Sequence, residues 1–201
     1  MEYFFYCRDR QGAGELRWTV TEEHWAFMDR YAEGMIARGP TLTPDGTEVT
    51  GSVHIVDLPD AGAAQEFAFD EPYYKAGVFE DVLVRRWTNT LGRTMWEFTG
   101  GEAGHGRFLA IAHAKPGRTA AREELAGEHH RYLAHDHRAH VIVAGPLLSE
   151  DGATWAGTAM LMELPDRDAV EALLAEDPCA RAGLYERVEI HDWRFGGRPQ
   201  A

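Results

Sequence analysis

Two histidines and two acidic residues of this chain have the types and positions that proton-transfer chemistry needs. We group them into two pairs, His24 with Glu71 and His129 with Asp177. In each pair the acid lies far downstream of the histidine and directly before a proline. A carboxylate bonded to one imidazole nitrogen fixes the tautomer and raises the basicity of the other nitrogen. Such a pair suits removal of a proton from a phenol, an enol or a carbon next to a carbonyl. Loss of a leaving group, or reprotonation elsewhere, would complete a lyase or isomerase reaction without a cofactor.

These two pairs occupy equivalent positions of an internal tandem repeat. The segment Gly39-Pro40 recurs as Gly145-Pro146, and the offset is 145 − 39 = 106 residues. The longest matching block, which follows the acid of each pair, keeps the same offset. Upstream, between His24 and His129, the offset is 129 − 24 = 105 residues. One extra residue must therefore lie between His129 and the second Gly-Pro, and a similarity that holds over a whole unit indicates a duplication.

Each copy shows the hydrophobic periods of four strands and two helices. In the first copy the expected strands are 3–7, 35–36, 53–57 and 82–85, with helices over 22–28 and 61–69. In the second copy the expected strands are 108–112, 141–143, 160–163 and 188–191, with helices over 123–133 and 168–175. Asp60 and Asp166 precede the second helices, where aspartate caps a helix N-terminus. The order β-α-β-β-α-β is that of a ferredoxin-like unit.

Such a unit lays both helices on one face of an antiparallel sheet, and its other, apolar face must be buried. We therefore predict an α+β fold in which two ferredoxin-like βαββαβ units pack sheet to sheet as an intramolecular dimeric α+β barrel. The first unit is expected to span residues 1–88 and the second residues 107–195. Residues 89–106 are expected to form a linker, and residues 196–201 a tail.

Three further motifs occur in both copies. An arginine lies seven residues before each histidine, a Gly-Pro follows the second expected strand, and an acid-Pro-x-x-x-Ala-Gly-apolar-aromatic-Glu block follows the second helix. On these motifs the chain resembles the YCII-related family of small dimeric α+β barrel proteins, over nearly all of both copies. The family pattern has aspartate before the proline of the last block. The second copy keeps it as Asp177, whereas the first copy has Glu71.

The resemblance implies an active-site cleft in which the histidine and the acid act as a catalytic pair. One relative eliminates chloride from a chlorinated hydroxyhydroquinone. Because it retains the aspartate, the pair of His129 and Asp177 is the favoured catalytic site, with His24 and Glu71 as the second. The alternative is that each histidine caps a helix or holds the acid-proline turn in place.

Three other side chains are candidates for binding the substrate. Arg17 and Arg122 would hold an anionic substrate oxygen or a neighbouring carboxylate, or lie exposed near a helix N-terminus. Tyr73 would line an aromatic pocket in the first unit, although at helical spacing an aromatic residue is more often part of the core.

Metal and cofactor signals are weak in this sequence. His135, His137 and His140 have a spacing that can present imidazoles at a helix end. The first copy has no counterpart to them, so we expect a solvated helix end and no metal. A phosphate-cradling glycine loop and a Gly-x-Ser-x-Gly elbow are both absent, which disfavours nucleotide-dependent transfer and serine hydrolysis. We expect no cofactor.

The composition excludes several classes of partner. The chain has 201 residues, a formal net charge of −13 and a pI of about 5.2, and this charge repels nucleic acid and anionic membranes. It contains no apolar run of the roughly 20 residues that a membrane span needs. We find no export signal, and two cysteines are too few for a disulfide framework. We expect a cytoplasmic protein that acts on a small molecule, either as a monomer with pseudo-twofold symmetry or as a homodimer.

Three functions remain open from the residues alone. The first is a cofactor-independent enzyme of the lyase or isomerase type, acting on a hydroxylated aromatic or enolic substrate. The second is a non-catalytic binding or accessory protein. This function would be favoured if the protein still bound its ligand after loss of both histidines. The third is cofactor-free oxygenation, which predicts oxygen consumption with an electron-rich phenol.

Overall fold

A computed structural model describes residues 1–198, which form two compact units. The first unit contains Met1–Arg85 and the stretch that begins at Arg194, and the second contains Arg86–Trp193. Of the expected tail, residues 199–201 lie outside the described residues. The expected limits of the units and of the linker stay predictions. No helix within residues 1–198 is long and apolar enough to span a membrane.

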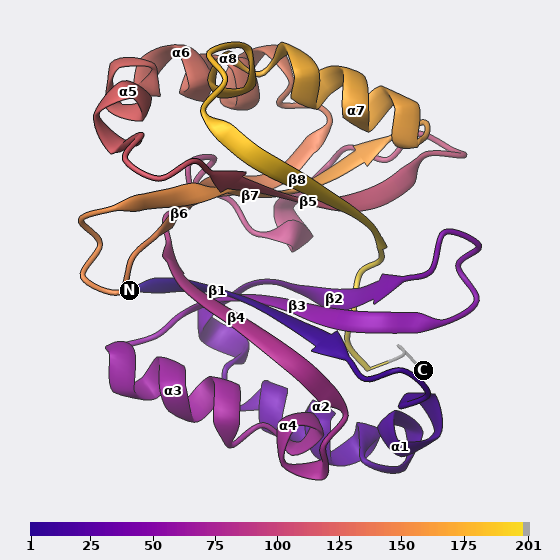
Figure 1. Ribbon diagram of the computed structural model, residues 1–201. Coiled ribbons are helices and arrows are strands. Elements are labelled where there is room, and N and C mark those ends of the chain that lie inside the picture. The colour runs from indigo at the N-terminus through magenta and orange to yellow at the C-terminus, as the bar shows by residue number, and fades with distance from the viewer. Residues whose placement is uncertain (199–201) are drawn as a thin grey trace. The chain divides into compact units, whose positions relative to one another are not determined.

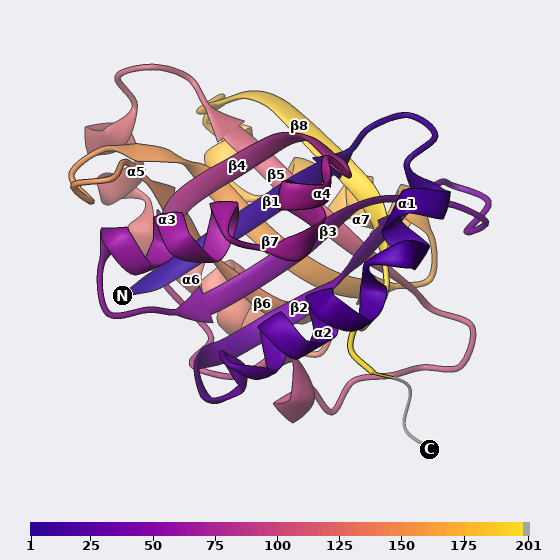
Figure 2. The same ribbon diagram turned by 90° about the horizontal axis from the view of Figure 1, so that it is seen from below.

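The first unit has four strands and four short helices. The strands are β1 (Glu2–Asp9), β2 (Met35–Leu42), β3 (Val49–Asp57) and β4 (Phe79–Trp87), and the helices are α1 (Gly14–Thr19), α2 (Thr21–Asp29), α3 (Ala61–Phe69) and α4 (Pro72–Ala76). The strand order is β4-β1-β3-β2, and β3 pairs antiparallel with both β1 and β2. All four helices cover one face of this sheet (Figures 1 and 2).

The second unit repeats this arrangement. Its strands are β5 (Gly106–Ala114), β6 (Val141–Leu148), β7 (Trp155–Leu164) and β8 (Tyr185–Trp193), and its helices are α5 (Thr119–Glu124), α6 (Ala126–Arg131), α7 (Arg167–Glu176) and α8 (Pro178–Arg181). The strand order is β6-β7-β5-β8, with antiparallel pairing throughout. The helices again lie on one face of the sheet (Figure 1).

The expected order β-α-β-β-α-β is confirmed in both units, with two local differences. The helix expected over 123–133 is divided at Leu125 into α5 and α6. A π-helical turn, Tyr132–Asp136, then follows α6, whereas the first unit has a single 3₁₀ turn, Ala32–Gly34, at this place. A π turn is the form that a helix takes when one residue is inserted. The extra residue inferred from the change of offset is therefore accommodated here.

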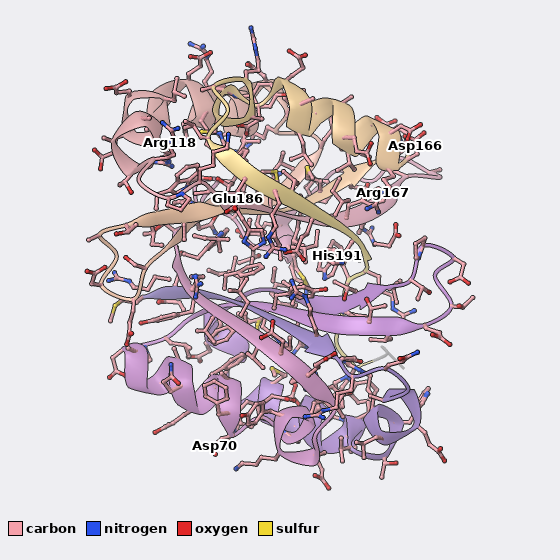
Figure 3. The ribbon with its side chains drawn as sticks, in the orientation of Figure 1. Asp70, Arg118, Asp166, Arg167, Glu186 and His191 are labelled. Atoms are coloured by element: carbon pink, nitrogen blue, oxygen red, sulfur yellow. The ribbon has the colours of Figure 1, made fainter. Side chains whose placement is uncertain are left out.

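Capping and apolar packing explain why these elements form. Asp60 and Asp166 accept hydrogen bonds from the backbone N–H groups of Ala63 and Ala169, each at 2.9 Å, as expected for N-terminal caps. Figure 3 shows Asp166 where α7 begins. Between helices and sheet, each unit buries its own apolar core, and Phe67 of α3 packs its ring against that of Phe5 of β1 at 4.6 Å in the first unit.

Candidate active site

The first histidine–acid pair is bonded and buried in the first unit. His24 comes from α2, and Glu71 comes from the turn between α3 and α4, beside Asp70 (Figure 3). The Nδ1 atom of His24 lies 2.5 Å from Oε1 of Glu71. The other carboxylate oxygen accepts from the backbone N–H of Tyr74 at 2.9 Å and so caps α4. Only 8% of His24 and 3% of Glu71 are exposed, so the carboxylate holds Nδ1 and leaves Nε2 for other partners.

Tyr73 and Arg17 build the wall beside this histidine. The ring of Tyr73 stacks on His24, with centroids 4.1 Å apart, and its hydroxyl lies 3.1 Å from Oγ1 of Thr21. The guanidinium carbon of Arg17 lies over the Tyr73 ring, 4.3 Å from the ring centre. Burial raises the pKa of Tyr73, and Thr21 and Arg17 oppose that rise. The phenol is therefore neutral at physiological pH.

Arg17 is held by a carboxylate that sequence analysis did not single out. Its Nε and Nη2 atoms donate to both oxygens of Asp9, at 2.8 and 2.9 Å, and Nη2 also donates to Ser52 at 2.8 Å. Of the roles considered for Arg17, binding of a neighbouring carboxylate is the one that the structure shows. Burial lowers the pKa of Arg17, but its hydrogen bonds to Asp9 outweigh that and leave it raised.

A cavity of about 1150 Å³ lies beside the first pair. Every residue that lines it belongs to the first unit, and the lining includes Arg17, His24, Trp25, Arg38, His54 and Tyr73. Five arginines line the cavity against three carboxylates. Two of these arginines are paired, Arg17 with Asp9 and Arg198 with Glu22 and Asp29, so the lining is mixed in charge.

The stretch that begins at Arg194 forms part of this cavity wall. The backbone N–H groups of Arg194 and Gly196 donate to Pro40 and Arg38 of β2, at 3.2 and 3.0 Å. Farther on, Arg198 forms ion pairs with Glu22 and Asp29 of α2. The sequence offered no sign that these residues contribute to a site.

His54 is a further histidine of the cavity that sequence analysis missed. It lies on β3, its ring centre is 5.7 Å from that of His24, and only 3% of it is exposed. Burial lowers the pKa of His54 well below its usual value of 6.5, and the electrostatic effects of His24, Arg38 and Arg17 lower it further. The second copy has Met160 at this position (54 + 106 = 160). Comparing the copies position by position would have exposed this polar replacement.

We expect His54→Met to flatten the pH dependence of stability on the acid side. As the pH falls below about 6.5, the unfolded chain takes up a proton at His54 that the folded chain does not, so the wild type loses stability by up to about 1.4 kcal/mol per pH unit. Methionine removes this proton uptake. Urea denaturation at pH 7, 6 and 5 measures the free energy of unfolding of both proteins, and parallel curves would contradict the assignment.

The second histidine–acid pair is also brought together, in the second unit. The Nδ1 atom of His129 on α6 lies 3.0 Å from Oδ2 of Asp177. The two atoms are not aligned for a hydrogen bond, however, and neither has another partner among residues 1–198. Oδ1 of Asp177 caps α8 by accepting from the N–H groups of Cys179 and Ala180. Burial lowers the pKa of His129, but Asp177 and Cys179 outweigh it and raise the pKa to about 9.

The surroundings of the two pairs differ at equivalent positions. Val49, which lines the cavity of the first unit, corresponds to Trp155 (49 + 106 = 155), which is only 4% exposed and packs with Cys179 and Leu184. Asp9 corresponds to Ala114 (9 + 105 = 114), and the buried Nε atom of Arg122 has no hydrogen-bond partner in the described chain. The first pair thus lies at an open cavity, whereas the second unit has a buried indole ring, packed with Cys179, at the position of the cavity-lining Val49.

The surface histidines lie at the π-helical turn. His137 packs on Tyr132, with ring centres 4.4 Å apart, and His130 lies 6.0 Å from His135. The pKa of His137 is lowered by burial and by the charge of His140. For His135, His137 and His140, a solvated helix end without a metal remains the prediction.

Comparison with known proteins gives matches to both halves of the chain. The model of the YCII-related domain matches residues 1–88 and 106–194. Protein YciI of Escherichia coli O6:H1 is 33% identical over 92 residues, which are 42% of this chain and 94% of that protein. The solved structure of the 5-chloro-2-hydroxyhydroquinone dehydrochlorinase TftG from Burkholderia phenoliruptrix is 28% identical, covers 44% of this chain and 94% of its own, and has a TM-score of 0.41.

A second solved structure matches nearly the whole chain. It is chlorite dismutase from Candidatus Nitrospira defluvii in complex with imidazole, which is 12% identical, covers 96% of this chain and 91% of its own, and has a TM-score of 0.58. At this identity the likeness shows the fold alone. The predicted α+β fold class, with two repeated units and eight strands, is confirmed.

Proposed function

The chain belongs to the YCII-related family, with one domain in each half, and on that basis we propose that its first unit is a cofactor-independent acid–base enzyme for a hydroxylated aromatic or enolic small molecule. His24 is the general base and acid, and Glu71 orients it. The observation that carries the proposal is the bonded His24–Glu71 pair at the wall of the cavity. We place the chemistry here rather than at His129 and Asp177, because the cavity lies at the first pair, and the second unit has the buried Trp155 at the position of the cavity-lining Val49.

The chemistry follows from the two ring nitrogens of His24. With Nδ1 bonded to Glu71, Nε2 is the nitrogen that can take a proton from a substrate hydroxyl or from a carbon next to a carbonyl. The imidazolium that forms is stabilised by the carboxylate of Glu71 at 2.5 Å. The electron pair left on the substrate then expels a leaving group, or the same proton returns at another atom. The first outcome is an elimination and the second an isomerisation.

The cavity lining supports the substrate class. Trp25 offers an aromatic surface to a planar ring, whereas His24 and Arg17 cover the ring of Tyr73. Arg38 and the neutral His54 lie on the lining as cationic and uncharged hydrogen-bonding groups. A phenolate or enolate oxygen is the charge that such a wall would stabilise as the proton leaves. Arg17 contributes its positive charge while Asp9 holds its guanidinium in place.

A small panel of substrates tests the proposal. The first probe is 5-chloro-2-hydroxyhydroquinone, from which loss of a proton and a chloride ion gives a hydroxybenzoquinone without any oxidant. Other hydroxylated arenes and enolisable ketones complete the panel, with absorbance, chloride release and proton exchange as readouts. We expect saturable turnover of at least one compound. Saturable binding of these compounds without turnover would show that the cavity is a binding site and would refute the proposed enzymatic function.

A further inference from the structure

The second unit contains a buried cluster of three metal-ligating side chains. The ligand atoms of His129, Asp177 and Cys179 all lie within 4.8 Å of one another, and all three residues are buried. We propose that these three side chains bind one divalent metal ion of the zinc class. The proposal is independent of the acid–base function of the first unit.

The hydrogen bonds of the cluster leave one ligand atom of each charged side chain available. Asp177 uses Oδ1 to cap α8, which points its other oxygen, Oδ2, at His129. Oδ2 and the Nδ1 atom of His129 form an ion pair at 3.0 Å, but the two atoms are not aligned for a hydrogen bond and have no other hydrogen-bond partner in the described chain. Buried polar atoms are nearly always satisfied. A metal ion bound to both atoms would satisfy them together.

Comparison with the first unit shows that two changes converge on this site. Where the first unit has Glu71 and Tyr73, the second has Asp177 and Cys179. The aspartate is one methylene shorter and does not form the aligned bond that Glu71 makes to His24. The cysteine adds a sulfur ligand that tyrosine lacks. Both differences turn a histidine–acid pair into a set of nitrogen, oxygen and sulfur ligands.

Ligand chemistry and charge select the ion. Zinc-class ions accept thiolate, imidazole and carboxylate ligands, whereas calcium and magnesium take oxygen ligands. The thiolate of Cys179 and the carboxylate of Asp177 cancel the two positive charges of the ion. The complex is therefore neutral, which suits a site where an uncompensated charge is costly. Binding converts the thiol of Cys179 to a thiolate and the imidazolium of His129, whose pKa is raised to about 9, to the neutral ring, so two protons are released to solvent.

A neighbouring side chain offers a partner to a fourth ligand, a bound water. Trp155 packs in the same apolar cluster as Cys179, and its buried Nε1–H has no hydrogen-bond acceptor among residues 1–198. A metal-bound water or hydroxide would supply that acceptor. Three protein ligands and one water complete the tetrahedral coordination that zinc prefers.

Cobalt(II) provides the test, because its bond to a thiolate gives a charge-transfer absorption that nitrogen and oxygen ligands do not. The full chain is treated with a chelator, freed of it and titrated with Co²⁺ alone. We expect the sulfur-to-cobalt band to saturate at one ion per chain and to disappear when Zn²⁺ is added. Cys179→Ala should abolish the band, and Asp177→Asn should weaken cobalt binding by at least about tenfold.

Two matched variants control for other binding places. Cys7 is the other cysteine, and Cys7→Ala introduces the residue that the second copy has there, Ala112 (7 + 105 = 112). This variant and His137→Gln, which alters the surface histidines, should keep the band. A folded wild type that gives no sulfur-to-cobalt band would overturn the proposal without any variant. A band that persists in Cys179→Ala would overturn it as well.

Discussion

Replacing His24 by alanine is expected to lower kcat by about 10²–10⁴-fold on whichever substrate of the panel is turned over, which is the usual contribution of a positioned general base. The imidazole is the one group that Glu71 orients beside the cavity. Its removal takes away the one base that Glu71 orients, whereas the arginines of the lining are unchanged. We therefore expect KM to change much less than kcat, and steady-state kinetics with both parameters resolved is the measurement.

Two further variants separate catalysis from folding. Glu71→Gln keeps a hydrogen-bond acceptor near Nδ1 but removes the charge that stabilises the imidazolium, so kcat should fall less than in His24→Ala. His129→Ala changes the equivalent histidine of the second unit and should leave kcat per folded molecule close to the wild-type value. Equal losses in His24→Ala and His129→Ala, at equal folded fractions by circular dichroism, would count against a site in the first unit.

Replacing Arg17 by methionine is expected to destabilise the protein by about 3–5 kcal/mol, the range found when one partner of a buried ion pair is removed. Asp9 has a side chain that is only 4% exposed, and Arg17 supplies two hydrogen bonds to it. Methionine would leave that carboxylate buried without its counter-charge. Urea denaturation at pH 7 measures the change in the free energy of unfolding.

The second copy suggests the compensating change. It carries Ala114 at the position of Asp9, so the double variant Asp9→Ala with Arg17→Met removes both charges. We expect the double variant to recover at least half of the stability lost in Arg17→Met, since no uncompensated charge remains. If the two effects simply add, the ion pair is not what makes Arg17 necessary for stability.

The repeat allowed much of the fold to be predicted, because the residues that recur in both copies meet local structural requirements. Gly51 and Gly157 recur because a side chain there would meet the neighbouring strand: a Cβ atom would lie 2.4 Å from the carbonyl oxygen of Cys7 or 2.1 Å from that of Ala112. The aspartate caps of α3 and α7 recur for an equally local reason. The change of offset by one residue predicted an insertion, and the π-helical turn after α6 contains it.

The candidate site was predicted in part. Both histidine–acid pairs meet as expected, but which pair lies beside an open cavity depends on side chains remote in sequence. The second unit has the buried Trp155 in place of the cavity-lining Val49, and no local pattern reveals how an indole will pack. The pairing of Asp9 with Arg17 and the burial of His54 beside Arg38 likewise depend on how α1, β2 and β3 pack. Hydrophobic periods do not encode such contacts.

The most direct test of a proton-transfer site in the first unit is a ¹⁵N NMR titration of the histidine ring nitrogens with 1,2,4-trihydroxybenzene. We predict that the Nε2 signal of His24 shifts as the ligand enters the cavity, whereas the ring signals of His129, which is buried in the second unit, stay in place. Saturable shifts at His129 with unchanged signals at His24 would contradict this account and move the chemistry to the second unit.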